Sequence, residues 1–331
     1  MEYEIIATLG PSSSQPDVWR AMLRSGATAF RLNTSHLNLP QLHDWLARLQ
    51  PFLEAQAIPL VLDLQGSKWR LGELQPVDLS DGQLVELSLI EGEEPRQHGA
   101  LALPVPHADF FKAALLSDGE IVLNDAKVRL ALERVEENWL LARTTQGGPL
   151  SARKGITFAS STFRTETLSE KDRAILEQTG SLGFVRCAFS YVKDAAEMAR
   201  YRELTAGILE HFPYLIAKLE RGLAMQEAAQ IAQFADELWV CRGDLGAELG
   251  LRAMAESVHR FSAQVRELPV PAIMAGQVLE HMTGHPTPTR SEACYLYDTL
   301  QAGYRGFVLS DETAVGRDPA ASCLVAATWK G

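Results

Sequence analysis

Short apolar runs alternate along the chain with longer segments of helical periodicity. Between most runs, segments such as residues 39–56 and 191–212 carry apolar residues at helical spacing. The runs themselves have the length and composition of buried strands and occupy residues 4–9, 28–33, 59–64, 183–189, 214–219, 237–242, 270–275 and 306–311. Strands that alternate with helices predict a parallel sheet with right-handed crossovers. Eight such units predict an α/β protein with a closed (β/α)8 TIM barrel, and a doubly wound open sheet is the alternative.

One connection does not follow this alternation. Residues 71–166 lack a strong helical period and contain short apolar runs separated by turn-forming residues. This pattern predicts a small β-barrel domain inserted after the third strand of the TIM barrel. The expected domains are a catalytic barrel of residues 1–70 and 167–331 and the inserted domain of residues 71–166. The helical pattern resumes after Ser169, a residue type that caps helices.

The composition is that of an ordinary globular protein, with 46% hydrophobic and 22% charged residues among 331. The formal net charge is −11 and no Lys/Arg run is present, which argues against a nucleic-acid partner. No apolar run reaches the roughly 18 residues of a membrane span, and the N-terminus does not have the pattern of a signal peptide. The four cysteines show neither zinc nor disulfide spacing. We therefore expect a cytoplasmic protein with no membrane partner.

Charged side chains gather at the carboxyl ends of the predicted strands. Because side chains alternate along a strand, Lys218 and Glu220 share one face where the 214–219 run ends. Charged or polar residues also end three other strands: Arg31, Asn33, Asp63, Arg242 and Asp244. In a (β/α)8 barrel the carboxyl ends of the strands form the active-site face, so these groups are expected to converge. A purely structural ring of salt bridges is the alternative, because buried charges are costly unless they are paired or used.

The residue types at these strand ends suit one kind of chemistry. Glu220 and Asp244 offer hard oxygen ligands for Mg²⁺ or Mn²⁺. A metal there could polarise a carbonyl or enolate oxygen, and Lys218 would stabilise the same developing negative charge. The backbone N–H groups of residues 242–250 could bind a carboxylate at the start of a helix, and Arg31 suits a phosphate. Together these groups predict a site for an anionic enol or keto acid, with metal and phosphate nearby.

Eight short motifs, in this order, resemble those of the pyruvate kinase family: ATLGPSS, FRLNTSH, ARKGI, LSEKD, AKLE, RGDLG, PTPTRSEA and LSDETAVG. The resemblance covers nearly the whole chain, and the inserted domain lies where the family has its mobile lid. The resemblance implies Mg²⁺-dependent phosphoryl transfer from phosphoenolpyruvate to ADP, a step of glycolysis that yields pyruvate and ATP.

The resemblance also implies roles for individual residues. Glu220 and Asp244 resemble the metal ligands of the family. Lys218 resembles the group that steadies the transferred phosphoryl group and the enolate. Contacts with phosphates and the nucleotide are implied for Arg31, Asn33, His36, Arg70 and Lys154. The backbone at Gly243 and Asp244 would receive the carboxylate of pyruvate.

Two departures from the family pattern change what is expected. The chain ends at AATWKG, so the family's C-terminal regulatory domain is expected to be absent, and a homodimer is expected instead of a tetramer. Gly276 stands where the family has a threonine that contacts the carboxylate and belongs to the proton path to the enol. The missing hydroxyl could slow protonation of the enolate or leave room for a larger substrate. Two alternatives therefore stay open: a metal-dependent pyruvate-enolate lyase or aldolase on the same barrel, and a catalytically weak pyruvate kinase-like protein.

A third departure, DLQGSKWR, concerns the monovalent cation. Typical members of the family need K⁺, bound by oxygens that match Asn33, Ser35, Asp63 and a threonine after that aspartate. Here Leu64 replaces the threonine and offers no side-chain oxygen. Lys68 replaces a glutamate of the family, as in members that work without K⁺. Because its tethered ammonium can supply the positive charge of the cation, Lys68 is expected to contribute to catalysis, and K⁺ is not expected to be required.

Overall fold

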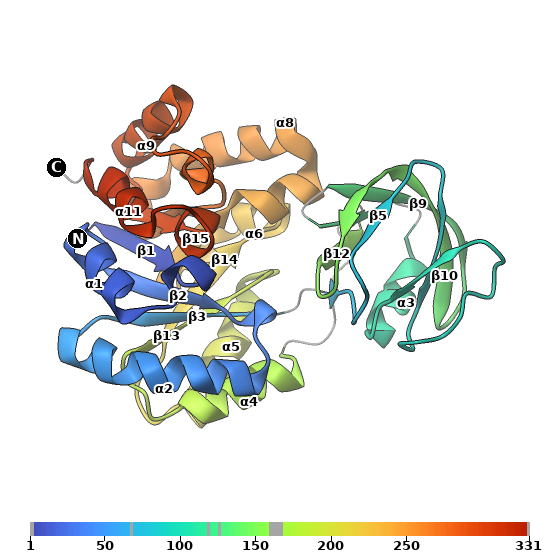
Figure 1. Ribbon diagram of the computed structural model, residues 1–331, viewed down its shortest axis with the longest axis horizontal. Coiled ribbons are helices and arrows are strands. Elements are labelled where there is room, and N and C mark those ends of the chain that lie inside the picture. The colour runs from blue at the N-terminus through green and yellow to red at the C-terminus, as the bar shows by residue number, and fades with distance from the viewer. Residues whose placement is uncertain (1–2, 67–68, 118–119, 125–126, 159–167, 330–331) are drawn as a thin grey trace. The chain divides into compact units, whose positions relative to one another are not determined.

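The computed structural model describes residues 3–66, 69–117, 120–124, 127–158 and 168–329. The chain divides into two compact units (Figure 1). The first comprises Met1–Gly66, Glu170–Arg242 and Ala255–Gly331, and the second comprises Ser67–Ser169 and Gly243–Met254. The grouping of Gly243–Met254 with the second unit was not expected from the sequence, which placed these residues with the barrel.

The first unit contains eight parallel strands that form a closed barrel, in the order β1-β17-β16-β15-β14-β13-β3-β2. The strands are β1 Glu4–Thr8, β2 Ala29–Asn33, β3 Leu60–Leu64, β13 Val185–Phe189, β14 Tyr214–Leu219, β15 Glu237–Cys241, β16 Ala272–Ala275 and β17 Gly306–Leu309. Every run predicted as a barrel strand forms one. The closed order confirms the TIM barrel and excludes the open doubly wound sheet.

Alternate side chains of these strands fill the barrel interior with an apolar layer. Its members are Ile6, Ala29, Val61, Ala188, Ile216, Trp239, Cys241, Ile273, Ala275 and Val308. Because side chains alternate along a strand, residues two positions later point into the same interior, nearer the carboxyl ends. On five strands these residues are polar: Thr8, Arg31, Asp63, Ser190 and Lys218. The apolar layer therefore supports a polar layer at the end of the barrel where active sites lie.

Helices surround the strands (Figure 1). They are α1 Pro16–Arg24, α2 Leu39–Gln56, α4 Glu170–Thr179, α5 Ala195–Ile208, α6 Gly222–Gln226, α7 Ala228–Ile231, α8 Arg242–Ser262, α9 Arg290–Ala302, α10 Asp311–Ala314 and α11 Pro319–Ala327. Short 3₁₀ helices lie at η1 Pro11–Ser13, η2 Thr34–His36, η3 Val265–Glu267 and η4 Glu280–Thr283. Helix α5 begins later than its periodicity predicted because Asp194 accepts the N–H of Glu197 and caps it there. None of the helices in the described residues has the length and apolarity needed to cross a membrane.

The second unit is built mainly from strands. A seven-stranded sheet has the order β4-β12-β8-β9-β10-β6-β7, and a separate pair is β11-β5. The strands are β4 Trp69–Arg70, β5 Val77–Leu79, β6 Leu84–Ser88, β7 Leu101–Pro104, β8 Glu120–Leu123, β9 Val128–Val135, β10 Trp139–Gln146, β11 Gly148–Leu150 and β12 Gly155–Phe158. One helix, α3 Ala108–Ala114, was missed, because seven residues are too few to establish a helical period. Its Phe110 ring packs 5.4 Å from Trp69 and 4.8 Å from Phe158 in the core of the unit.

Candidate active site

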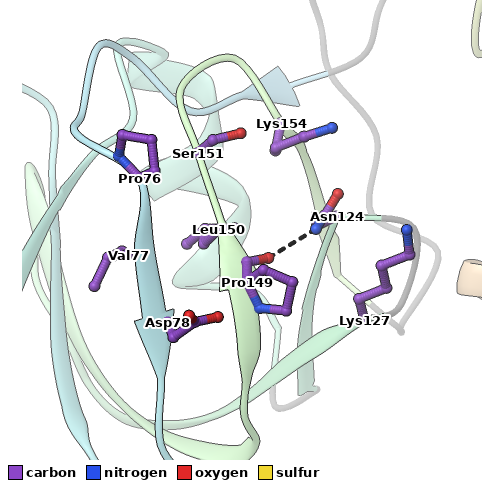
Figure 2. A pocket seen from close by; sticks show the side chains of 9 residues that line it. All are labelled: Pro76, Val77, Asp78, Asn124, Lys127, Pro149, Leu150, Ser151 and Lys154. Carbon is purple, nitrogen blue, oxygen red and sulfur yellow. Dashed lines mark hydrogen bonds between the residues drawn. The ribbon is translucent and has the colours of Figure 1, made fainter. Parts of the chain in front are cut away.

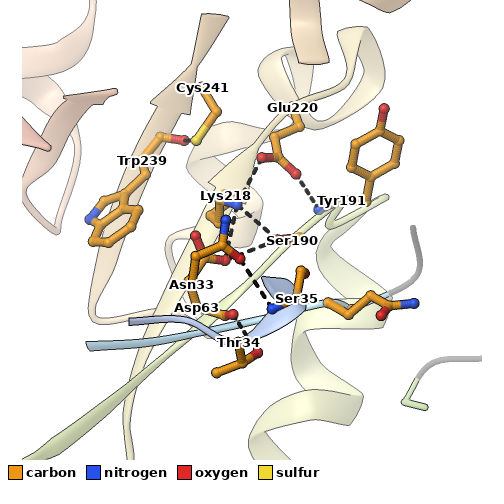
Figure 3. A network of polar contacts seen from close by, with 12 residues as sticks. Asn33, Thr34, Ser35, Asp63, Ser190, Tyr191, Lys218, Glu220, Trp239 and Cys241 are labelled. Carbon is orange, nitrogen blue, oxygen red and sulfur yellow. Dashed lines mark hydrogen bonds and ion pairs between the residues drawn. The ribbon is translucent and has the colours of Figure 1, made fainter. Parts of the chain in front are cut away.

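Asp63 lies at the centre of the polar layer at the carboxyl ends of the barrel strands. Its Oδ2 accepts hydrogen bonds from Arg31 Nε at 2.8 Å and Nη2 at 2.6 Å. Its Oδ1 accepts from Lys218 Nζ at 3.0 Å and from Ser190 Oγ at 3.1 Å (Figure 3). Burial acts to raise the pKa of Asp63, but the charges of Lys218 and Arg31 outweigh it and lower the pKa to about 2. The carboxylate is therefore ionised across the physiological range.

Within the described residues, Lys218 contacts the oxygen-bearing side chains of Asp63, Glu220 and Ser190. Besides Asp63, its ammonium lies 3.0 Å from Glu220 Oε1 and donates to Ser190 Oγ at 2.8 Å. Burial acts to lower the pKa of Lys218, and the carboxylates of Asp63 and Glu220 more than reverse this, so the pKa lies above its ordinary value. The lysine is thus a fixed positive charge. These contacts explain how the buried side chains of Lys218 and Glu220 are accommodated next to each other at the end of β14.

The two predicted metal ligands belong to different units, because Glu220 is in the first unit and Asp244 is grouped with the second. Glu220 directly follows β14, is 2% exposed, and accepts the backbone N–H of Tyr191 at 2.7 Å through Oε2. Asp244 lies in the first turn of α8, directly after β15 and Arg242. No group of three His, Cys, Asp or Glu side chains in the described part of the chain is arranged to hold a metal. Carboxylate oxygens are hard ligands of the type that Mg²⁺ prefers, and Mg²⁺ sites commonly combine one or two carboxylates with water and substrate oxygens.

The remaining predicted site residues of the first unit lie at the ends of barrel strands or shortly after them. Asn33 ends β2, and its Oδ1 accepts the N–H of Ser35 at 3.2 Å (Figure 3). His36 ends η2 and is exposed. Gly276 follows β16 with φ +79°, and its carbonyl oxygen accepts from Arg242 Nε at 3.0 Å. Arg242 thus fixes the loop that contains Gly276.

Arg70 and Lys154 belong to the second unit. Arg70 is in β4, and its Nη1 donates to the carbonyl oxygen of Arg153 at 3.0 Å. Lys154 lines a pocket of about 360 Å³ together with Lys127 and Asn124 (Figure 2). Lys68 lies outside the described residues, so its predicted role stays a prediction.

Three residues of the network were not predicted: Thr8, Ser190 and Tyr191. Thr8 Oγ1 accepts from Arg31 Nη1 at 2.7 Å. The alternation rule that selected Lys218 would also have found Thr8 and Ser190, because each lies two positions after an interior apolar residue. Tyr191 contributes its backbone N–H at φ +60°, which no side-chain pattern indicates.

A closed (β/α)8 barrel with a buried lysine, an arginine and carboxylates at the carboxyl ends of its strands is an α/β-barrel protein whose charged side chains gather where such barrels have their active sites. The sequence model of the family described as "Pyruvate kinase, barrel domain" matches residues 1–323, and the chain belongs to this family. This confirms the resemblance seen in the motifs.

The relatives extend beyond this chain. It is 33% identical over 319 residues to a pyruvate kinase of Agrobacterium vitis, a match that covers 96% of this chain and 66% of the relative. It is 31% identical over 321 residues to a pyruvate kinase of Methylorubrum extorquens, covering 96% and 65%. The crystal structure of a pyruvate kinase from Cryptosporidium parvum has a similar fold, with a TM-score of 0.82 at 20% identity, and the match covers 98% of this chain and 67% of that one. The chain therefore spans just under two thirds of the length of the two bacterial relatives.

Proposed function

We propose that the chain is a pyruvate kinase-like phosphotransferase that converts phosphoenolpyruvate and ADP to pyruvate and ATP. In this reaction the phosphoryl group leaves the enol oxygen for the terminal phosphate oxygen of ADP, and the enolate left behind takes a proton. The observation that carries the proposal is the Lys218 ammonium, held as a permanent cation between Asp63 and Glu220 at the active-site end of the barrel. Membership of the family supports the same reaction.

Lys218 and Arg31 would supply the positive charge that the reaction needs. The Lys218 ammonium is preorganised, so it can stabilise charge on the enolate and on the transferred phosphoryl group without reorganisation in the transition state. Arg31 uses its Nε, one Nη1 and one Nη2 hydrogen on Asp63 and Thr8 within the described part of the chain. A guanidinium has five N–H donors, so two of them can bind a phosphate.

Glu220 and Asp244 would hold Mg²⁺ or Mn²⁺. The residues fit the ion because both ligands are hard carboxylate oxygens, and Glu220 is oriented by the Tyr191 N–H. When bound, the metal would polarise the substrate oxygens and offset their negative charge. The backbone N–H groups of Gly243 and Asp244, in the first turn of α8, would bind the substrate carboxylate.

The bonds to Asp63 support independence from K⁺. A carboxylate has about four lone-pair sites, and among the described residues Arg31, Lys218 and Ser190 already donate four hydrogen bonds to Asp63. Its oxygens are therefore saturated without a cation. Leu64 adds no side-chain oxygen, and Lys68 is proposed to supply the charge that K⁺ supplies elsewhere in the family.

We also propose that the second unit is the lid. Contacts with phosphates and the nucleotide are proposed for Asn33, His36, Arg70 and Lys154. The pocket beside Lys154 and Lys127 supports this proposal because it places two ammonium groups on one side of the second unit. The cytoplasmic location and the homodimer stay predictions from the sequence.

Gly276 keeps a second candidate, a pyruvate-enolate lyase or aldolase, because the proton-path hydroxyl of the family is missing there. One assay separates the two. The protein is incubated with phosphoenolpyruvate, ADP and Mg²⁺, and pyruvate and ATP are followed together. Equal amounts of both products support the phosphotransferase. The same assay is repeated with a larger keto acid in place of phosphoenolpyruvate. Pyruvate formed from that keto acid, with no ATP formed from phosphoenolpyruvate and ADP, would support the lyase.

A further inference from the structure

The turn that follows β13 contacts both Lys218 and the proposed metal ligand Glu220. The Ser190 hydroxyl accepts from the Lys218 ammonium at 2.8 Å and donates to Asp63 at 3.1 Å. The backbone N–H of the next residue, Tyr191, donates to Glu220 at 2.7 Å. Figure 3 shows the turn reaching Lys218 through a side chain and Glu220 through the backbone. Two consecutive residues therefore fix the lysine and the carboxylate together.

The backbone of this turn is unusual. Tyr191 has φ +60°, in the left-handed region that bulky side chains seldom adopt. Such a conformation persists only where the surrounding structure imposes it. Here the Ser190 N–H donates to the carbonyl oxygen of Leu64 at 3.3 Å, and the Arg221 guanidinium lies 5.1 Å from the centre of the Tyr191 ring. Both residues of the turn are almost fully buried.

Gly66 packs directly against the turn. A Cβ atom at this position would lie 2.1 Å from the carbonyl oxygen of Ser190, so only glycine fits without moving the backbone. Asp172, the third residue of α4, is fully buried and accepts the N–H groups of Gln65 at 3.0 Å and Gly66 at 3.1 Å. Asp172 thus fixes the segment that abuts Ser190. Gly66 is also the last residue of the first unit before the chain enters the second.

We infer that the Ser190–Tyr191 turn positions Lys218 and Glu220 together, and that Gly66 holds the turn in place. The inference rests on the proposed function, because it assigns positions to the groups of that reaction. Ser190, Tyr191 and Gly66 act through Lys218 and Glu220 and are positioning residues. If the turn shifts, Glu220 loses the Tyr191 N–H and Lys218 loses the Ser190 hydroxyl in the same movement. Metal binding and turnover should then fall together.

Two glycine substitutions test the role of Gly66. Gly66 and Gly82 both have positive φ, at +59° and +80°, but a Cβ at Gly82 would meet nothing within 4 Å. Gly66→Ala and Gly82→Ala therefore share the backbone penalty, and only Gly66→Ala presses on Ser190. Mn²⁺ affinity is measured by calorimetry and kcat by pyruvate formation, with melting curves to confirm folding. Gly66→Ala should weaken Mn²⁺ binding and lower kcat, each by about tenfold or more, as expected when a hydrogen bond to a charged group is lost. Gly82→Ala should match the unmodified protein in both.

A second pair of variants separates the two contacts of the turn. Ser190→Ala removes the hydroxyl but keeps the Tyr191 N–H, so kcat should fall about ten- to a hundredfold while Mn²⁺ affinity changes little. Ser190→Thr keeps a hydroxyl and should recover part of kcat, which a purely structural role would not predict. Equal Mn²⁺ affinities and kcat values for Gly66→Ala and Gly82→Ala, or an unchanged kcat in Ser190→Ala, would overturn the inference. If the unmodified protein lacks phosphotransfer, the proposed function fails, and the Mn²⁺ affinities of Gly66→Ala and Gly82→Ala still decide the role of the turn.

Discussion

The Lys218 ammonium lies 3.0 Å from the carboxylate of Asp63, although the two residues are 155 positions apart in the chain. Their strands, β14 and β3, are not neighbours, because β13 lies between them. Ser190, directly after β13, contacts both groups and completes the link. Residues on or directly after three strands therefore hold the Lys218 ammonium, the charge proposed to stabilise the transition state.

Replacing Lys218 should impair catalysis far more than substrate binding. Lys218→Met removes the ammonium while keeping a similar apolar stem, so kcat should fall by about 10²–10³, as for other preorganised charge-stabilising groups. The change also leaves Asp63 and Glu220 buried without their shared cation, so the free energy of unfolding should fall by about 3–5 kcal/mol. Steady-state kinetics and urea unfolding measure the two effects. A loss of kcat below about fivefold, worth ~1 kcal/mol, would reduce Lys218 to a structural partner of Glu220.

Removing either proposed metal ligand should abolish metal-dependent turnover. Glu220→Ala or Asp244→Ala takes away one of only two protein carboxylates proposed for the site, so Mn²⁺ binding measured by calorimetry should also be lost. Glu177→Ala, an exposed carboxylate on α4, is the control and should bind Mn²⁺ as before. Retained activity with an unchanged Mg²⁺ requirement in either site variant would show that the metal binds elsewhere.

Restoring the family's threonine should cost stability. Gly276 has φ +79°, and a β-branched residue in this region is strained by about 1–3 kcal/mol, so Gly276→Thr should lower the free energy of unfolding by that amount. Gly284→Thr is the matched control, because Gly284 has φ −110° and open space around it. Urea unfolding compares the two. Equal stabilities would show that the loop can change conformation.

If the protein is a kinase working without the hydroxyl, proton exchange at the methyl carbon of pyruvate should be faster in Gly276→Thr.

Turnover should not depend on the monovalent cation. The four hydrogen bonds that described residues donate to Asp63 occupy its lone pairs, so rates in Na⁺, K⁺ and tetramethylammonium buffers of equal ionic strength should agree. Lys68→Glu should reduce activity and make part of it recoverable with K⁺, although Leu64 limits the recovery. A rise of about tenfold or more in the unmodified protein on adding K⁺, worth ~1.4 kcal/mol in the transition state, would contradict this prediction.

Stability should fall as the pH rises towards neutrality. Burial raises the pKa of Glu312 from 4.5 to about 7, although the backbone N–H groups of Ser310 and Leu279 donate to its carboxylate and act to lower the pKa. A carboxyl group with a raised pKa stabilises the fold below about pH 4.5 and loses that contribution as the pH rises through 7, by about 1.4 kcal/mol per unit. Glu312→Gln should therefore flatten the dependence of the unfolding free energy on pH between 4.5 and 7, and the exposed Glu203→Gln should not. The pKa of Glu237 is also raised to about 7. Because both variants retain Glu237, the unfolding free energy of each still depends partly on pH. Urea midpoints across this range provide the measurement, and identical slopes in the two variants would contradict the assignment.

The barrel could be predicted from the amino-acid sequence alone. Eight apolar runs alternating with helical segments are enough to specify a parallel barrel, because each run must be buried and each helix must cover it. The period of two along a strand then places Lys218 and Arg31 on the interior side. The barrel topology places strand ends together whatever their separation in the chain, so the convergence of these charges was also predictable.

The partner of each charged group could not be predicted from the sequence. Distances between Asp63, Lys218 and Ser190 depend on the stagger of strands that are far apart in sequence, and local patterns carry no information about that stagger. The left-handed conformation of Tyr191 and the close approach of Gly66 arise from packing around them, which overrides the preference of a tyrosine for other backbone regions. The short helix α3 likewise depends on the burial of Phe110 in the core of its unit and not on a helical period. Composition and periodicity predict which groups meet, and packing determines the geometry in which they meet.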